Sequence, residues 1–341
     1  MTQYNTKNEL IKKRYEQYLE LDERLSSQTV YGKIKDLRKY EEFTGFKCFS
    51  AFNAERGTTF KEHLKTSRNN SGETLDYATI WRTLKNLKEF LAWLTQQPGY
   101  RSKVKPAYLR VLNLSNKEEN IAKRKDLGDA PTLEQARKAI LAMPTHTLQE
   151  RRNRAMVAFT LVTGVRVNAL ISLKICHVDE FRLLLKQNPK DVNTKFSKAI
   201  RTQFFPVGDD IHQIVLAWLK ELKETLAFGQ KDPLFPAMLS EFDPATGGFK
   251  QDKLSQNHIT STTTVREVFK QAWANAGMQY FNPHSFRSTL TQLGEQICQT
   301  PEQFKAWSQN LGHSSPLTTF TSYGDVHATR QCDLIKTMGS P

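Results

Sequence analysis

Apolar residues recur at three- and four-residue steps through much of the first hundred residues, which is the spacing of an amphipathic helix. The pattern predicts one helix from about residue 7 to residue 25, a second from there to residue 43, and a third from Asp76 to Thr95. A loop rich in Ser, Asn and Gly at residues 67–72 precedes the third helix. These elements predict a small all-helical bundle.

A basic stretch follows the bundle. Residues 101–110 carry no acidic side chain, and the next charged segment is poor in large apolar residues. The chain then turns, and Thr132 can cap a new helix. We therefore expect a helical domain at residues 1–111, a basic linker at 112–130 and a second domain at 131–341.

The second domain mixes helical and strand-like patterns. A helix around residues 154–161 breaks at Thr163-Gly164 and resumes after Arg166. Strand-like runs follow at residues 181–185, 192–198 and 202–207. The last two runs predict a basic β-hairpin that carries Lys195 and Lys198. The expected fold class is mainly α with a small β-hairpin or sheet, that is, α+β.

Charge narrows the possible partners. The 341-residue chain has a formal net charge of +14, spread over both halves, which indicates a polyanion such as DNA or RNA. It has no apolar run near the ~18 residues of a membrane span and no apolar signal-peptide core. The four cysteines show neither metal-binding nor disulfide spacing, which fits a reducing cytoplasm.

Two arginines occupy positions where a side chain is well held. Arg166 follows a tight turn between two helices, and a fixed guanidinium suits bidentate binding of a phosphate. Asn282 suits a helix N-cap and Pro283 the first helical position. His284 and Arg287 would then lie one turn apart on one face, at a helix end that favours anions.

The last candidate is a corner between two helices near the C-terminus. Gly312 can take the left-handed conformation that ends a helix, and Ser315-Pro316 can begin the next one. His313 would lie at the bend, and Tyr323 about two turns along the second helix. A tyrosine on a short helix usually serves packing. Beside a histidine it can also act as a nucleophile.

Taken in order, these motifs resemble the tyrosine recombinase, or phage integrase, family. In that family an arginine after a Thr-Gly turn, a hairpin lysine, a His-x-x-Arg, a Leu-Gly-His and a downstream tyrosine form one active site. The matching residues here are Arg166, Lys198, His284, Arg287, His313 and Tyr323. The resemblance covers the chain from about Thr132 onward. The N-terminal bundle resembles the family's core-site-binding domain in size and helical character.

There are two departures from the family pattern. Ala169 stands where the family often has an acidic residue that holds the first arginine, so another group must orient Arg166. The hairpin also offers two lysines. Lys198 fits better because it stands eight positions before Pro206, and Lys195 remains an alternative.

The resemblance implies a reaction. Tyr323 would attack a DNA phosphodiester to give a 3′-phosphotyrosine and a free 5′ hydroxyl, with His284 as the proton acceptor. Lys198 would protonate the leaving 5′ oxygen. Strand exchange and religation would then proceed through a Holliday junction, as in a site-specific recombinase or integrase.

The resemblance also implies that no metal and no cofactor take part. Arg166 and Arg287 would neutralise the two non-bridging oxygens, and His313 would donate a hydrogen bond to one of them. From Asn282 to Tyr323 the only carboxylates are those of Glu295 and Glu302. These are too few to hold a catalytic metal.

The implied partners are double-stranded DNA with paired core sites and three further copies of the chain in a tetramer. A tail at residues 326–338 has helical apolar spacing and would dock either on its own subunit or on a neighbour. Accessory DNA-bending or directionality factors are possible partners, whereas a membrane is not expected. The expected location is the cytoplasm, in association with the nucleoid.

Three alternatives compete with recombination. A type IB topoisomerase uses much the same groups as a monomer, but the compact N-terminal domain and the tail favour recombination. A DNA-binding architectural protein that has lost its chemistry would not need Arg166, Arg287 and Tyr323. A metal-dependent nuclease would lose its activity in EDTA.

Overall fold

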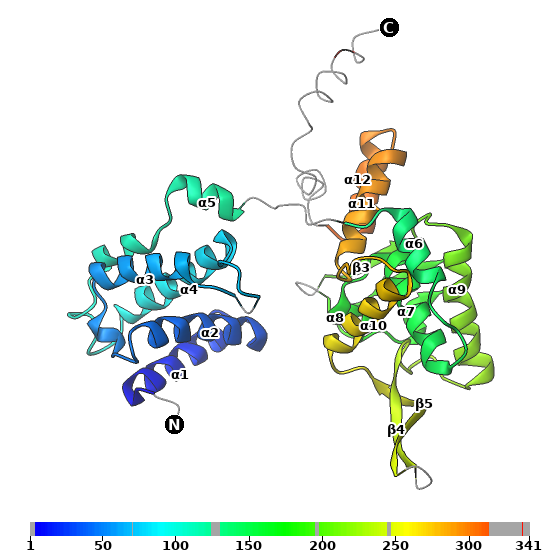
Figure 1. The fold of residues 1–341 in the computed structure, drawn as a ribbon, viewed down its shortest axis with the longest axis horizontal. Helices are drawn as coiled ribbons and strands as arrows, with labels where there is room; N and C mark the ends of the chain where they lie inside the picture. The colour runs from blue at the N-terminus through cyan, green and yellow to red at the C-terminus, as the bar shows by residue number, and fades with distance from the viewer. Residues whose placement is uncertain are drawn as a thin grey trace. The chain divides into compact units, whose positions relative to one another are not determined.

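The chain forms two compact units, Met1–Lys125 and Asp126–Pro341. The computed structural model describes residues 4–69, 71–123, 130–194, 198–243, 247–313 and 336 (Figure 1). In the first unit the elements are α1 (Thr6–Leu21), α2 (Ser27–Phe43), η1 (Phe49–Ala51), α3 (Ala54–Thr66), α4 (Tyr77–Leu94), η2 (Pro106–Leu112) and α5 (Asn116–Lys123).

The first unit is a helical bundle, and its helices begin where the sequence supplies caps. Ser26 accepts a hydrogen bond from the N–H of Thr29 at the start of α2, and Asp76 does the same for Thr79 at the start of α4. Phe90 and Leu91 of α4 are fully buried in the core. The helix α3 is not predicted by the apolar pattern, because most of its residues are small or polar.

The helix α5 belongs to the first unit, although it lies inside the segment 112–130 that the sequence suggests as a linker. Lys65 of α3 pairs with Glu118 of α5 at 2.8 Å. The hydrogen bond from Lys65, with a further one from Ser115, lowers the pKa of Glu118 to about 2. This pairing helps to hold α5 on the bundle.

The second unit is α+β. Its helices are α6 (Leu133–Leu141), α7 (Leu148–Thr163), α8 (Val167–Leu170), η3 (Ile175–His177), α9 (Asp209–Lys220), η5 (Glu221–Thr225), α10 (Thr262–Asn275), α11 (Ser285–Ile297) and α12 (Pro301–Asn310). Its strands are β1 (Val178–Asp179), β2 (Leu184–Gln187), β3 (Ile200–Gln203), β4 (Pro236–Asp243) and β5 (Gly248–His258).

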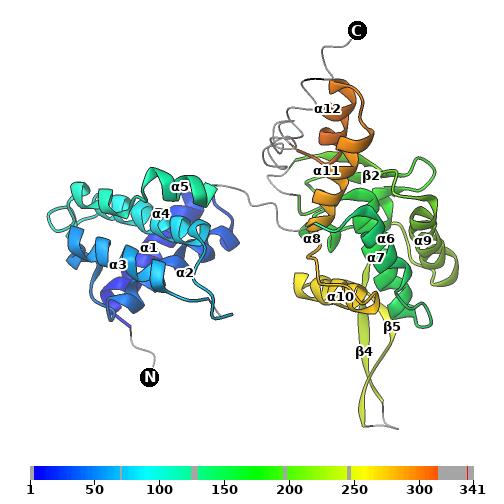
Figure 2. The ribbon, with the colours of Figure 1, turned by 45° about the horizontal axis from the view of Figure 1, so that its top comes forward.

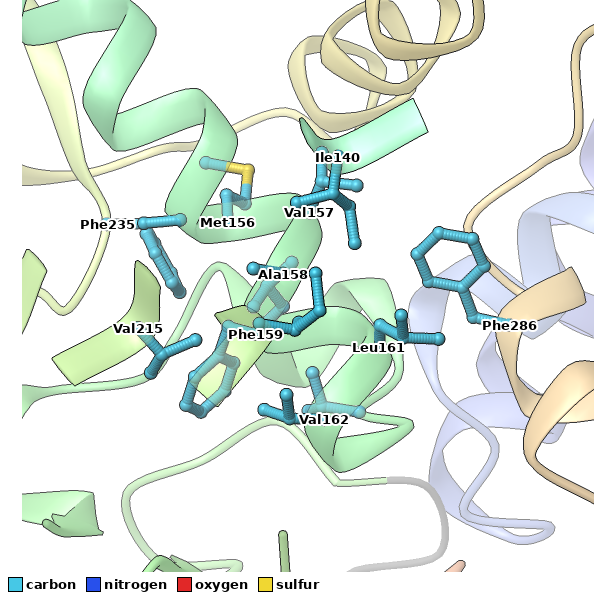
Figure 3. Close-up of a cluster of buried hydrophobic side chains, with 14 of the residues drawn as sticks. Ile140, Met156, Val157, Ala158, Phe159, Leu161, Val162, Val215, Phe235 and Phe286 are labelled. Carbon is cyan, nitrogen blue, oxygen red and sulfur yellow. The ribbon is translucent and has the colours of Figure 1, made fainter. Parts of the chain in front are cut away.

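The core of the second unit surrounds α7. Every residue of α7 from Ala155 to Thr163 is buried, as expected for a helix that is covered on all sides. Figure 3 shows Phe159 and Leu161 of α7 with Val215 of α9 and Phe286 of α11 around them. Because α7 ends at Gly164, this packing fixes the place where Arg166 leaves the core.

The small sheet differs from the predicted hairpin. It is antiparallel in the order β1-β2-β3, and β2 pairs with β3 in the register Leu185 opposite Thr202. Residues 192–194 are not a strand, so the prediction of a strand at 192–198 is wrong over the part that the structure describes. The apolar residue Val192 is buried in the core rather than paired in the sheet, which explains the misleading pattern.

A second hairpin, formed by β4 and β5, was not expected from the sequence. Figure 2 shows it extending away from the helices of the second unit. Within the described residues, no helix is both long enough and apolar enough to cross a membrane.

Candidate functional site

Arg287 lies at the junction of three helices in the second unit. Its side chain is buried, with Nη1 donating to the carbonyl oxygen of Gly164 and Nη2 to that of Leu311, both at 2.6 Å. These carbonyls end α7 and α12, and helix C-termini attract cations. Arg287 therefore ties together the turn that precedes Arg166 and the turn that precedes His313.

Arg166 leaves the core directly after the turn predicted at Thr163-Gly164. Gly164 has φ +58°, the left-handed conformation expected of a glycine that ends a helix. The carbonyl of Arg166 accepts the first hydrogen bond of α8, from the N–H of Leu170. Ala169 is buried and has no polar atom on its side chain, so it cannot hold the guanidinium of Arg166 as an acidic residue would.

The two arginines form a site of concentrated positive charge. Burial, and secondarily the charge of Arg166, lowers the pKa of Arg287 to about 9. Burial also lowers the pKa of Arg166. Among the residues that the structure describes, no carboxylate forms an ion pair with either guanidinium. Two neighbouring cations that no described carboxylate neutralises can attract an anion.

His284 is positioned by the start of α11. The side-chain oxygen of Asn282 accepts a hydrogen bond from the N–H of His284 at 2.9 Å, and the N–H of Arg287 donates to the carbonyl of His284 at 3.1 Å. The helix begins at Ser285, slightly later than the predicted cap at Asn282 implies. His284 is exposed and Arg287 is buried, so the two motif residues face solvent and core respectively.

His313 follows the end of α12. Gly312 has φ +69°, and a Cβ atom placed on it would lie 2.9 Å from Cδ1 of Ile200. This close approach sets the Leu311-Gly312-His313 turn against the first residue of β3. Lys198 is exposed two positions before Ile200, so the turn also brings the segment that carries Lys198 beside the segment that carries His313.

The structure thus gathers the segments of Arg166, Lys198, His284, Arg287 and His313 around the ends of α7, α11, α12 and β3. The predicted nucleophile Tyr323, the alternative Lys195 and the predicted helix start at Ser315-Pro316 lie outside the described residues. The arrangement can hold a phosphate on two guanidinium groups, with histidine and lysine side chains at its edge.

Asn310 is a residue of this region that sequence reasoning missed. Its side-chain oxygen accepts a hydrogen bond from the N–H of Gln203 at 2.7 Å, and its Nδ2 donates to the carbonyl of Gln203 at 2.8 Å. Nothing in the sequence around Asn310 indicates this contact, because its partner lies 107 residues away.

The first unit carries a polar groove of about 1360 Å³ between α2, α4 and the end of α3. Its cationic side chains are those of Lys33, Lys35, Lys39, Arg68 and Arg82. Within the described part of the chain, no group of three or more His, Cys, Asp or Glu residues could hold a metal ion.

A buried carboxylate organises this groove. Asp36 of α2 accepts hydrogen bonds from Nζ of Lys39 and Nδ2 of Asn86, both at 2.8 Å, and lies 3.4 Å from Nε of Arg82. Burial would raise the pKa of Asp36, but hydrogen bonds from Lys39 and Asn86 outweigh burial and hold that pKa below its usual value.

Comparisons with known proteins identify the family and the fold. Residues 132–330 match the model of the phage integrase family. The fold is similar to lambda integrase (75–356) in a dimer bound to a COC′ core site, with a TM-score of 0.61 and 15% identity, over 94% of this chain and 99% of that chain. It is also similar to the Tn1549 transposon integrase in complex with transposon right end DNA, with a TM-score of 0.60 and 14% identity, over 97% and 99%. A comparison with curated protein sequences gives no match.

Proposed function

The chain belongs to the phage integrase family and is a site-specific DNA recombinase of the tyrosine class, and we propose that its own residues carry out the reaction as follows. Tyr323 attacks a DNA phosphodiester, forming a bond between its phenolic oxygen and phosphorus while the bond to the 5′ oxygen breaks. A free tyrosine has a pKa of ~10, so its proton passes to His284 during the attack. Lys198 gives a proton to the departing 5′ oxygen.

Arg166 and Arg287 hold the phosphate and neutralise the charge that builds on its non-bridging oxygens, with a hydrogen bond from His313. The observation that carries this assignment is the charge of the arginine pair. Within the described part of the chain, Arg287 uses one N–H on each of two nitrogens to bind backbone carbonyls, and in this proposal its three other N–H groups face the phosphate.

DNA is the partner of the chain. We place the DNA contact of the first unit at the groove that holds Lys33, Lys39 and Arg82, because phosphate neutralisation by such side chains dominates DNA affinity. The 3′-phosphotyrosine is resolved by the 5′ hydroxyl of a partner strand, through a Holliday junction, in a tetramer on two paired core sites. The tail at 326–338 and accessory DNA-bending factors would regulate this assembly in the cytoplasm.

The test is covalent trapping. A nicked duplex that carries a candidate site from the DNA flanking the gene is incubated in EDTA with wild type, Tyr323→Phe and Arg287→Lys, and the products are separated on a denaturing gel. We expect a covalent protein–DNA band with wild type alone. Tight binding without a band in wild type would identify the protein as one that binds DNA without cutting it. A band that persists in Tyr323→Phe would exclude Tyr323 as the nucleophile.

A further inference from the structure

The edge of β3 is completed by a side chain. In the order β1-β2-β3, one edge of β3 pairs with β2, and among the described residues no strand pairs with the other edge. On that other edge, the side-chain amide of Asn310 accepts a hydrogen bond from the N–H of Gln203 and donates one to its carbonyl. The carbonyl of Asn310 also accepts a hydrogen bond from Oγ1 of Thr202 at 2.9 Å. Asn310 therefore bonds to β3 as one residue of a further strand would.

Two contacts of Trp307 also hold the end of α12 in place. The rings of Trp307 in α12 and Phe205 after β3 lie 4.7 Å apart, and Nε1 of Trp307 donates to the carbonyl of Leu290 in α11 at 2.8 Å. The end of α12 is thus fixed both to the sheet and to the helix that carries Arg287.

The contact between Asn310 and β3 lies close in sequence to two predicted catalytic residues. Lys198 lies two residues before β3, and His313 lies three residues after Asn310. A lysine beside an edge strand moves as that strand frays, since local opening costs little free energy where backbone bonds are exposed. Proton transfer requires the donor within hydrogen-bond distance of its acceptor, so such motion would slow the reaction.

We propose that Asn310 is a positioning residue that fixes the segment bearing Lys198 against the segment bearing His313, so that Lys198 can protonate the leaving 5′ oxygen. This role rests on the proposed function of Lys198. Asparagine suits the position because one amide has both the acceptor and the donor that the peptide groups of Gln203 require.

The experiment compares two nicked substrates of identical sequence. One has an ordinary phosphodiester, and the other has sulfur in place of the bridging 5′ oxygen. A thiolate leaves without a proton, so the second substrate does not need Lys198. Wild type, Asn310→Ala, Asn310→Asp, Thr202→Val and Lys198→Ala are compared in single-turnover cleavage. Gln309→Ala is the matched control, since its exposed side chain lies one residue earlier on α12.

We expect Asn310→Ala to slow cleavage of the ordinary substrate by about tenfold or more, as a misplacement near 1 Å can do. On the sulfur substrate we expect its rate to lie within roughly threefold of wild type, following the pattern of Lys198→Ala. Asn310→Asp keeps the acceptor and loses the donor, so its defect should be intermediate. Equal slowing on both substrates, or no slowing on either, would overturn the proposal.

Amide hydrogen exchange tests the same contact without depending on DNA cleavage. Amide hydrogen exchange at Gln203 should be faster in Asn310→Ala than in wild type and unchanged in Gln309→Ala. If Gln203 exchanges at the same rate in all three proteins, the bond does not protect β3 and the proposal fails. Failure of the proposed function looks different, because Lys198→Ala would then show no rescue by the sulfur substrate.

Discussion

In the first unit two cationic side chains of the groove converge on a buried carboxylate, whereas in the second unit the central guanidinium is held by two backbone carbonyls. Asp36 orders Lys39 and Arg82 at the groove, and Gly164 and Leu311 order Arg287. A carboxylate fixes its partners but cancels a full unit of charge. Carbonyl dipoles fix a guanidinium and leave its charge intact. The first arrangement suits binding in a defined orientation, and the second suits stabilisation of charge that develops during a reaction.

The largest expected effect comes from Arg287→Lys. One ammonium group cannot reach both carbonyls and a phosphate, so we expect cleavage to fall by about 10³-fold or more. The buried carbonyls that lose their partner should also reduce the free energy of unfolding by about 1–3 kcal/mol. Single-turnover cleavage and urea unfolding measure the two effects. Arg266→Lys, the same change at an exposed site on α10, is the control. Activity within tenfold of wild type would show that the two carbonyls and the phosphate do not share Arg287.

The next effect concerns the first unit. Asp36→Asn keeps the shape of the side chain and removes its charge, so Lys39 and Arg82 lose their common anchor. We expect affinity for the specific site to fall by roughly 10–30-fold, while affinity for random DNA rises slightly because the groove gains net positive charge. Competition binding at two salt concentrations measures the affinity for the specific site and the affinity for random DNA separately. If both affinities rise together, the carboxylate does not orient the groove.

A smaller effect should distinguish the two units by their response to an anion. Inorganic phosphate should stabilise the second unit by occupying the arginine pair, by about 1.4 kcal/mol when phosphate is about tenfold above its Kd. For a domain of this size, that raises the melting temperature by about 3–6 °C. Thermal unfolding of wild type and Arg166→Gln, with chloride at equal ionic strength as the control, measures the shift. Equal shifts in both proteins would place the bound phosphate elsewhere.

The smallest effect is the acid dependence of the first unit. The folded pKa of Asp36 is depressed, so its stabilising contribution is complete above the unfolded pKa of ~3.9 and disappears as the pH falls through the folded value. The stability difference between wild type and Asp36→Asn should therefore be constant from pH 7 to 5 and shrink below about pH 4, by on the order of 1 kcal/mol. Denaturant unfolding across this range measures it. A difference that grows on acidification would contradict the assignment.

Features that depend on nearby residues could be predicted from the sequence. The cap at Thr132, the break at Thr163-Gly164 and the left-handed conformation of Gly312 each follow from a residue type and its immediate neighbours. The candidate site residues could also be identified from the sequence, because each belongs to a short local motif. Their catalytic roles stay predictions. Family membership followed from the order of those motifs, and the match over residues 132–330 confirms it.

Features that depend on distant partners could not be predicted. The strand β3 pairs with β2, with Leu185 opposite Thr202, and the described residues 192–194 form no strand because Val192 is buried in the core. The hydrogen bond from Arg287 to Gly164 spans 123 residues, and the contact of Asn310 with Gln203 spans 107. No periodicity or spacing along the chain encodes such pairs.

The conformation and close packing of Gly312 predict which second-site mutations can compensate for its replacement. Its positive φ favours glycine, and a Cβ atom placed on it would lie 2.9 Å from Cδ1 of Ile200, so Gly312→Ala strains the backbone and also forces the side chain of Ile200 to shift. Selection for second-site revertants of Gly312→Ala should therefore recover smaller residues at position 200. Such revertants would relieve the collision and leave the backbone penalty, so no single compensating change should restore full activity.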